Sequence, residues 1–284
     1  MAQGGEKMIT VKKVLNNNVI IAEHSQYDEI VLIGKGLGFG KKTGDEVAGQ
    51  KAEKFFVLKD AQEQQQYINL LEYVDESFIE MMNDFIGKIE ERFQTSLNEH
   101  IHVGLTDHLY FAIKRIKQGM DVKNPFGRET ELAYPKEYAM ATEIVEALND
   151  KLNMKIPTGE IGFIALHIHS ALSNRALNEI NKHTMLVTEL VNMIEDNLKI
   201  TIDKQDMNYL RLVRHLHHTI DRVTSGNYME EQDALKKVLQ EEYPICYTLS
   251  WKLMRVMQQK LQKPVPDAES VYLTLHIQRL YNKI

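Results

Sequence analysis

The segment HLYFAIKRIKQG at residues 108–119 returns as HLHHTIDRVTSG at residues 215–226, which lies 107 positions further along the chain. Five positions of the segment keep their residue in both copies. A second pair of segments, YPKEY at 134–138 and YPICY at 243–247, repeats at a shift of 109, which implies a length difference of two residues in the intervening loop. Similarity at a nearly fixed shift is typical of a repeated structural unit, so we predict two homologous modules of about a hundred residues each.

Each copy carries one histidine early and one late. His108 and His215 begin the first pair of matching segments, and the second shift aligns LHI at 166–168 with LHI at 275–277. A single histidine on an amphipathic helix is usually a hydrogen-bonded residue at the core boundary. Two equivalent pairs that survive a duplication in which most other residues changed indicate a shared chemical role. The four residues of these pairs are His108, His167, His215 and His276.

Three chemical roles are open for the paired histidines. A metal site is one, although the sequence lacks an HExxH motif. Acid–base catalysis is another, but no nucleophile motif such as G-x-S-x-G is present. The third is reversible phosphorylation, because a neutral imidazole is a competent nucleophile at cytoplasmic pH and the added dianion would alter helix packing or a subunit interface. Asp107 is a candidate to orient one ring nitrogen of His108. Most of the histidines without a counterpart are expected to be structural or solvated, among them His100, His102, His169, His217 and His218.

Composition narrows the function classes. The chain has 284 residues, enough for two or three domains. With 34 Lys and Arg against 40 Asp and Glu, its net charge is −6, so a nucleic-acid site has to be a local basic patch. The one cysteine, Cys246, excludes an intrachain disulfide and a cysteine-based zinc site, and we expect it to be buried. No apolar run approaches the roughly 20 residues of a membrane-spanning helix, and the N-terminus lacks the apolar core of a signal peptide. We expect a cytoplasmic protein.

Residues 9–58 have the pattern of short β-strands. Runs rich in Val and Ile alternate with turn residues, at 9–15, 19–22, 29–33 and 55–58. Asn16-Asn17-Asn18 suits a hairpin turn, since Asn tolerates positive φ. Alternating glycines from Gly34 to Gly40 can bring backbone N–H groups close to a ligand. Because a sheet of about fifty residues has a small core, dimerisation is a natural means of stabilising it.

The same segment contains the second candidate site. Lysines at 12, 13, 35, 41 and 42 flank the Asn and Gly loops of an otherwise acidic chain. With Phe39 as a stacking surface and the Asn18 amide as a partner for base edges, this set suits single-stranded or bulged RNA. On spacing alone, a solvated lysine face is the simpler interpretation. A Walker phosphate loop is excluded, because GKGLGFGKK does not fit its pattern.

From residue 68 the apolar period becomes that of helices. It fills the segments 68–93, 105–116, 138–152, 161–172, 186–198, 210–223, 234–239, 249–261 and 271–280, with Gly and Pro between them. Residues 59–67 are a linker or the start of a helix, and Thr158-Gly159-Glu160 and Asp267-Ala268-Glu269 are candidate helix caps. We therefore predict a multidomain protein, in which a small antiparallel β module precedes two homologous all-α helical bundles.

Several motifs together resemble one known family. VKKVLNNNVI at 11–20, with VLIGKGLGFGKKTGDEV at 31–47, resembles the co-antiterminator RNA-binding domain of the BglG/LicT/SacY family of bacterial transcription antiterminators. LTDHLYFAIKR with EIGFIALHIH, and LRLVRHLHHTIDR with VYLTLHIQRL, resemble the two phosphotransferase-system (PTS) regulation domains of that family. The resemblance covers residues 9–284 in the family's domain order. KNPF and LSWKL are similar to its glucose-operon branch.

The resemblance implies domain boundaries and site residues. It implies a flexible tail at 1–7, an RNA-binding domain at 8–60, a linker at 61–67 and regulation domains at 68–176 and 177–284. The family's RNA-contacting positions fall on Lys13, Asn18, Gly34, Lys35, Gly36 and Phe39, and its phospho-acceptor positions on His108, His167, His215 and His276. Lys35 stands where relatives have arginine, so it keeps the attraction for phosphate but loses the planar guanidinium.

The resemblance also implies a mechanism. A homodimer would bind a hairpin in nascent leader mRNA and exclude an overlapping terminator, so that polymerase reads into a sugar-transport gene. The likeness to the glucose-operon branch implies that this sugar is glucose. The EIIB domain of the sugar permease would phosphorylate the first regulation domain, at His108, and HPr would phosphorylate the second. The family is not enzymatic, and it implies no cofactor, no metal and no membrane insertion. Two alternatives compete: a DNA-binding regulator, which requires a helix-turn-helix ahead of the regulation domains, and a metal-dependent hydrolase that uses the paired histidines.

Overall fold

The structure, a computed structural model, describes residues 8–24, 28–49, 52, 54–56, 61–120, 122–226 and 233–282. The chain forms two compact units. The first comprises Met1–Asp121 with Ala171–Asn174, and the second comprises Val122–Ser170 with Arg175–Ile284. Each unit is described by itself.

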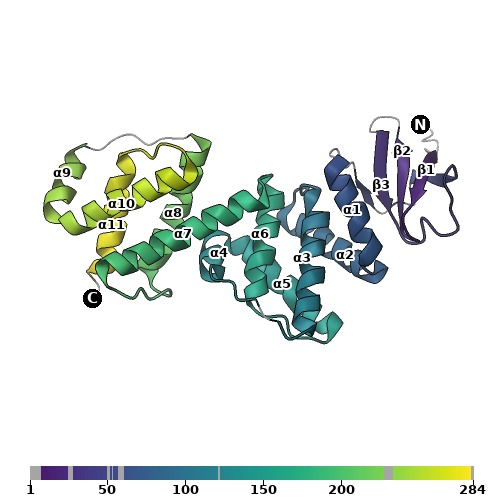
Figure 1. Ribbon diagram of the computed structural model, residues 1–284, viewed down its shortest axis with the longest axis horizontal. Helices are drawn as coiled ribbons and strands as arrows, with labels where there is room; N and C mark the ends of the chain where they lie inside the picture. Colours follow the sequence, from purple (N-terminus) through teal and green to yellow (C-terminus); the bar gives the residue numbers. More distant parts are fainter. Residues whose placement is uncertain are drawn as a thin grey trace. The chain divides into compact units, whose positions relative to one another are not determined.

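The first unit begins with a small antiparallel sheet (Figure 1). Its strands are β1 (Met8–Val14), β2 (Val19–His24), β3 (Asp28–Ile33), β4 (Glu46–Ala48) and β5 (Lys54–Phe56), in the order β4-β1-β2-β3-β5. The predicted hairpin turn at 16–18 joins β1 to β2, which pair from Val14 with Ile20 outward. The pattern missed β4, whose sequence EVA contains a single strongly strand-forming residue, Val47.

Both faces of the sheet are buried. On one face, Ile20, Ile30 and Leu32 pack with Leu37 and Val47 of the module's own loop and edge strand. The opposite face packs against the helices that follow it, α1 (Ala61–Tyr73) and α2 (Glu76–Phe93). The residues of this second cluster include Val19, Ile21, Val31, Ile33, Tyr67, Leu70 and Ile79. The chain's own helices thus enlarge the small core of the sheet, and dimerisation stays a prediction.

Residues 61–67, for which we expected a linker or the start of a helix, belong to α1 and are not a linker; residues 59 and 60 lie outside the described residues. The single apolar period at 68–93 is divided between α1 and α2, because Asp75 has an extended backbone with φ −62° and ψ 140°. The third helix of the unit, α3 (His100–Lys117), packs against both α1 and α2. The break contains neither Gly nor Pro, so it could not be predicted from the residue pattern.

The second unit is helical, apart from its connecting loops, over the residues described. Its helices are α4 (Gly127–Ala133), α5 (Pro135–Leu152), α6 (Gly159–Ser173, whose last residues belong to the first unit), α7 (Leu177–Leu198), α8 (Met207–Ser225), α9 (Asp233–Glu242), α10 (Pro244–Leu261) and α11 (Ala268–Tyr281). Pro135 and Pro244, predicted as breakers, begin α5 and α10, where a missing N–H has no cost. Gly226 ends α8 in the left-handed conformation, with φ 73°.

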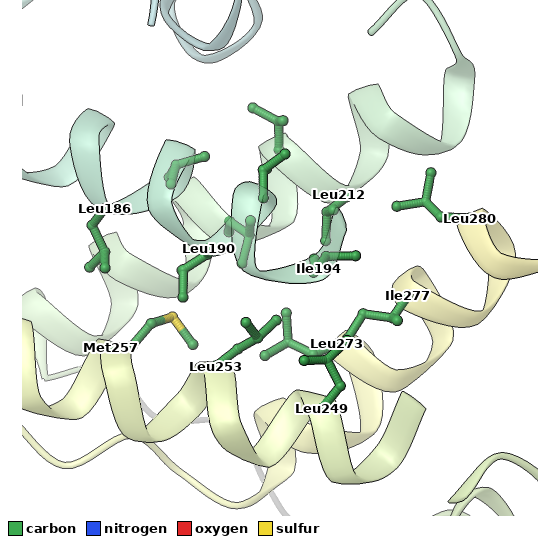
Figure 2. Close-up of a cluster of buried hydrophobic side chains, with 14 of the residues drawn as sticks. Leu186, Leu190, Ile194, Leu212, Leu249, Leu253, Met257, Leu273, Ile277 and Leu280 are labelled. Carbon is green, nitrogen blue, oxygen red and sulfur yellow. The ribbon is translucent and has the colours of Figure 1, made fainter. Parts of the chain in front are cut away.

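The core of the second unit lies between α7, α8, α10 and α11. Figure 2 shows Leu190 and Ile194 of α7 facing Leu253 of α10, with Ile277 of α11 beside them. Cys246 is 1% exposed in this core, as predicted. None of the described helices is long and apolar enough to cross a membrane.

The short helix α4 was not predicted, and it packs on this core. Leu132 joins the apolar cluster of α7 and α8. Glu129 is fully buried and accepts a hydrogen bond from Lys204 Nζ at 2.8 Å and another from the Tyr209 hydroxyl. Burial by itself would raise the pKa of Glu129, but these two hydrogen bonds hold it below its usual value. A helix from the first copy of the repeat is therefore fixed to helices of the second.

Candidate functional site

Two loops of the N-terminal sheet form one continuous surface. The Gly34 N–H donates to the Asn18 carbonyl at 2.9 Å, and the Gly38 N–H donates to the Asn17 carbonyl at 2.8 Å. Within the first loop, the Asn16 side chain accepts from the backbone N–H groups of Asn18 and Val19, at 2.9 and 2.8 Å. These bonds fix the Asn loop against the Gly loop, so residues that are sixteen or more positions apart form a single edge.

At two positions of this edge the backbone requires glycine. A Cβ at Gly38 would lie 2.2 Å from the Asn16 carbonyl oxygen, too close for any side chain. Gly36 has φ +68°, the left-handed region that side chains disfavour. Gly38 and Gly36 thus permit the close approach of the two loops, whereas the approach of backbone N–H groups to a ligand stays a prediction.

The structure brings the six predicted RNA-contacting residues to this edge of the module, in differing states. The Phe39 ring is 74% exposed, and Lys13 and Lys35 are exposed as well. Asn18 is only 9% exposed, and both ends of its amide are engaged. Its Oδ1 accepts from the Gly36 N–H at 2.5 Å, and its Nδ2 donates to Glu80 Oε1 of α2 at 2.7 Å. The hydrogen bond to Glu80 could not be predicted from the sequence, because its partners are 62 positions apart.

The second histidine pair is a contact between α8 and α11. The rings of His215 and His276 stack, with centroids 4.8 Å apart and an interplanar angle of 28°. Tyr272 lies on the same face of α11, 6.0 Å from His215 between ring centroids. Nδ1 of His276 is buried and has no hydrogen-bond partner among the described residues. The late and early histidines of this copy therefore lie side by side, a contact that the repeat alone did not predict.

The buried carboxylate of Glu269 contacts the side chains around His215. Glu269 accepts from Arg222 Nη2 at 2.7 Å and from the Thr219 hydroxyl at 2.9 Å. His215 Nε2 lies 3.4 Å from that hydroxyl and 3.5 Å from Glu269 Oε2. Because the Thr219 proton is directed to the carboxylate, the nearby negative charge favours a proton on Nε2 of His215 and leaves Nδ1 with the lone pair.

The environment keeps this pair of histidines neutral. Burial, together with the neighbouring His276 and Arg222, lowers the pKa of His215 to about 3. Burial and the guanidinium groups of Arg279 and Arg211 also lower the pKa of His276. Both rings therefore carry a free lone pair at neutral pH, as a nucleophile requires.

Glu269 has a different role from the helix capping that we expected of residues 267–269. Asp267 of the candidate cap Asp267-Ala268-Glu269 is the N-cap residue of α11, but its side chain makes no capping bond. The Glu269 side chain is 2% exposed within the histidine site. Arg222 and Glu269 were not predicted as site residues. The signal that would have found them was present, because both recur in the first copy, as Arg115 and Glu160.

The first histidine pair occupies equivalent helices. His108 is the ninth residue of α3, as His215 is of α8, and His167 lies on α6. Both first-copy side chains are half-buried. Asp107, the candidate to orient His108, accepts a hydrogen bond from the Tyr73 hydroxyl at 2.6 Å. The carboxylate is thus tied to the end of α1.

Three unpaired histidines gather in the second unit. His169 stacks on Tyr134, with centroids 3.8 Å apart, and its Nδ1 lies 2.9 Å from Glu137 Oε1. His217 and His183 are 7% and 6% exposed. Burial lowers the pKa of His217 to about 4 and also lowers that of His183. These contacts are consistent with the structural role that we expected of most unpaired histidines, which stays a prediction. In the described parts of the chain, no group of three or more His, Cys, Asp or Glu side chains could hold a metal ion.

Known families and proteins match the chain along its length. The CAT RNA binding domain family matches residues 9–65, and the PRD domain family matches residues 83–171 and 188–280. The PtsGHI operon antiterminator of Bacillus subtilis is 54% identical over 275 residues, which is 97% of this chain and 98% of that protein. The GlcA/glcB genes antiterminator of Staphylococcus carnosus is 38% identical over 269 residues, 94% of each chain.

A solved structure agrees with these matches. The crystal structure of GlcT CAT-PRDI is 57% identical, with a TM-score of 0.53, and covers 58% of this chain and 98% of its own. The N-terminal residues that a DNA-binding regulator would use for a helix-turn-helix form β-strands instead. The chain belongs to the BglG family of transcription antiterminators, with one CAT RNA-binding domain and two PRD domains, and resembles the glucose-operon members of that family.

Proposed function

We propose that this protein stabilises an antiterminator hairpin in the leader mRNA of a sugar PTS operon, and that the sugar is glucose, as the names of its relatives suggest. The observation that carries the proposal is the continuous edge formed by the Asn and Gly loops, with an exposed Phe39 ring between exposed lysines. An aromatic ring that stacks on an unpaired base, next to ammonium groups that attract phosphate, is suited to a bulged or looped hairpin. A bound hairpin that shares sequence with a terminator would prevent the terminator from forming. Because the target is nascent mRNA, we infer that the protein acts in the cytoplasm.

We assign the RNA contacts to Lys13, Asn18, Gly34, Lys35, Gly36 and Phe39. The supporting geometry is that all six lie in β1 or in the two loops laced together by backbone hydrogen bonds. The domain boundaries proposed with this assignment are 8–60 for the RNA-binding domain, 68–176 for the first regulation domain and 177–284 for the second. A homodimer would present two such edges to one hairpin, which raises affinity without new contacts.

The regulatory input is phosphorylation of the paired histidines. A permease EIIB domain would transfer its phosphoryl group to His108 of the first regulation domain, with His167 as the second acceptor of that copy. HPr would act on His215 and His276. In each transfer the bond from phosphorus to the donor breaks, a phosphorus–nitrogen bond to the neutral ring forms, and the other ring nitrogen keeps its proton. The lowered pKa of His215 supports this chemistry, because the ring is neutral at cytoplasmic pH.

The RNA half of the proposal is tested by Phe39→Ala. With RNA transcribed from the leader of the ptsGHI operon, after which the Bacillus subtilis relative is named, we expect the Kd to rise about tenfold or more, since a stacked base is worth roughly 1–3 kcal/mol. Phe111→Ala is the matched control, because Phe111 is also exposed, at 43%, but lies on α3. Equal affinities of the Phe39 variant and the wild type, in fluorescence anisotropy, would refute the assignment of this edge.

The phosphorylation half is tested by mass spectrometry of the intact protein. After incubation with phosphoenolpyruvate, enzyme I and HPr, with or without the permease EIIB domain, we expect permease-dependent phosphate on His108 and HPr-dependent phosphate on the second pair. His108→Ala should abolish the first signal and leave the second. Absence of phosphate on all four histidines would reduce them to structural residues.

A further inference from the structure

We propose that the acidic face of α2 is an intramolecular competitor of RNA, which occupies the edge of the RNA-binding surface at Asn18. This inference rests on the proposed function, because it assumes that Asn18 and Lys35 contact RNA. The direct contact is the hydrogen bond from Asn18 Nδ2 to Glu80 Oε1 at 2.7 Å, which joins residues 62 positions apart. The same amide that we assign to a base edge is thus occupied by a carboxylate of the regulatory part of the chain.

The contact is part of a built surface. A pocket of about 210 Å³ separates the RNA edge from α2. Asn18, Gly34 and Lys35 form its wall on the RNA side, and Glu80, Asn83 and Asp84 form its wall on the α2 side. Three of the six assigned RNA contacts therefore face a helix that presents two carboxylates and an amide. In a nucleic acid, lysine and asparagine side chains bind negatively charged phosphate oxygens and hydrogen-bonding base edges. The carboxylates and the amide on this face of α2 offer the same kinds of group.

An apolar contact holds the helix in this place. Ile79, the residue before Glu80, is 3% exposed and packs with Val19, Val31 and other residues on the sheet face that α1 also covers. Because adjacent residues of a helix diverge by about 100°, burying Ile79 against the sheet directs Glu80 along the sheet edge toward Asn18. Glu80 itself remains largely exposed, so an incoming RNA can compete for Asn18 without first unfolding the helix.

Charge decides between two interpretations of this pocket. If α2 were an additional part of the RNA site, it would bring the carboxylates of Glu80 and Asp84 beside RNA phosphates, and like charges at short range repel. If α2 is a competitor, the same carboxylates replace the phosphates and partly neutralise Lys35. The second arrangement is the favourable one, and it makes the conformation described here a low-affinity state. The apparent RNA affinity is then reduced by the fraction of molecules in which α2 has moved away from the edge.

The test is a comparison of charge-matched variants of the full chain. Glu80→Gln removes the charge but keeps an oxygen that can accept from Asn18, and Glu80→Ala removes the contact. Glu91→Gln is the control, because Glu91 is exposed on the same helix and the substitution changes the net charge equally. We expect the Kd for the ptsGHI leader RNA, measured by fluorescence anisotropy, to fall about fivefold in both Glu80 variants and to stay unchanged in Glu91→Gln.

The outcomes separate the competitor from its alternatives. Weaker RNA binding by both Glu80 variants would overturn the proposal and make α2 part of the RNA site. Equal gains in Glu80→Gln and Glu91→Gln would overturn it too, since the effect would be one of net charge. Unchanged affinity in both Glu80 variants would show that the contact does not compete. Failure of the wild type and both Glu80 variants to bind RNA would refute the proposed function itself, whereas binding by the variants alone would support strong competition.

Discussion

In the second copy of the repeat, the residue four positions after His215 is Thr219, whereas the equivalent residue after His108 in the first copy is Ala112. The residue before the histidine is Arg214 in the second copy and Asp107 in the first. The histidine, arginine and glutamate of the site are common to both copies, while the groups that surround them differ in charge and in hydrogen bonding. If the paired histidines accept phosphate as proposed, the two copies keep the same nucleophile while the surfaces that a phosphoryl donor would recognise differ. We therefore expect the two copies to be phosphorylated by different donors.

The largest effect is expected from the shared glutamate. Glu269→Ala removes a carboxylate that is 2% exposed and leaves Arg222 without its partner, which should lower the free energy of unfolding by about 3 kcal/mol. Trp251, the chain's one tryptophan, packs against the core of this module and reports its urea unfolding by fluorescence. Glu242→Ala, at an exposed position of α9, is the control. If both variants unfolded at the wild-type urea concentration, Glu269 would have no structural role.

A smaller effect is expected from pH. The folded-state pKa of His215 is lowered to about 3, so the unfolded chain takes up this proton near pH 6.5 while the folded protein does not. The corresponding stability is complete above pH 6.5 and is lost as the pH falls toward 3. Between pH 7 and pH 5 this histidine should lower the free energy of unfolding by about 2 kcal/mol. In His215→Gln, the Trp251 transition should lose that part of its pH dependence. An unchanged slope would contradict the lowered pKa.

The smallest effect concerns the residue that distinguishes the copies. Thr219→Ala gives the second copy the residue of the first and deletes the hydroxyl that donates to Glu269 at 2.9 Å. Since Thr219 is fully buried, we expect a loss of about 1 kcal/mol in the free energy of unfolding. Permease-dependent phosphorylation of the variant's second module would show that this hydroxyl contributes to the choice of donor. The wild-type pattern of phosphorylation would place donor choice elsewhere, for example at Arg214.

The repeat and the alternating or helical apolar periods were sufficient to predict the two helical modules and the principal strands, because these depend on local spacing. Two features of the fold were not predicted, because they leave little trace in the pattern of apolar residues along the sequence. The helix α4 has seven residues and follows a Pro-Phe-Gly turn, and the break at Asp75 lies within an uninterrupted apolar period. Each is determined by packing against residues distant in sequence.

The sequence was sufficient to propose the residues of the candidate sites, but not the contacts that those residues make. Duplication identified the four histidines, and the same comparison contained Arg222 and Glu269, whose partnership required the fold to bring α8 beside α11. The sequence showed Asn18 as an amide in a turn next to lysines. That its amide is held by Glu80 depends on α2 lying at the sheet edge, and no pattern within either segment encodes that contact.

The burial of both sheet faces has a kinetic consequence. A second subunit that pairs with this module through the face packed on α1 and α2 must wait for those helices to leave it. Dimer assembly by that route would therefore have a first-order opening step before the bimolecular encounter, and its observed rate would reach a plateau as protein concentration rises. The level of the plateau would equal the opening rate, so a stopped-flow titration would measure directly how firmly the helices hold the sheet.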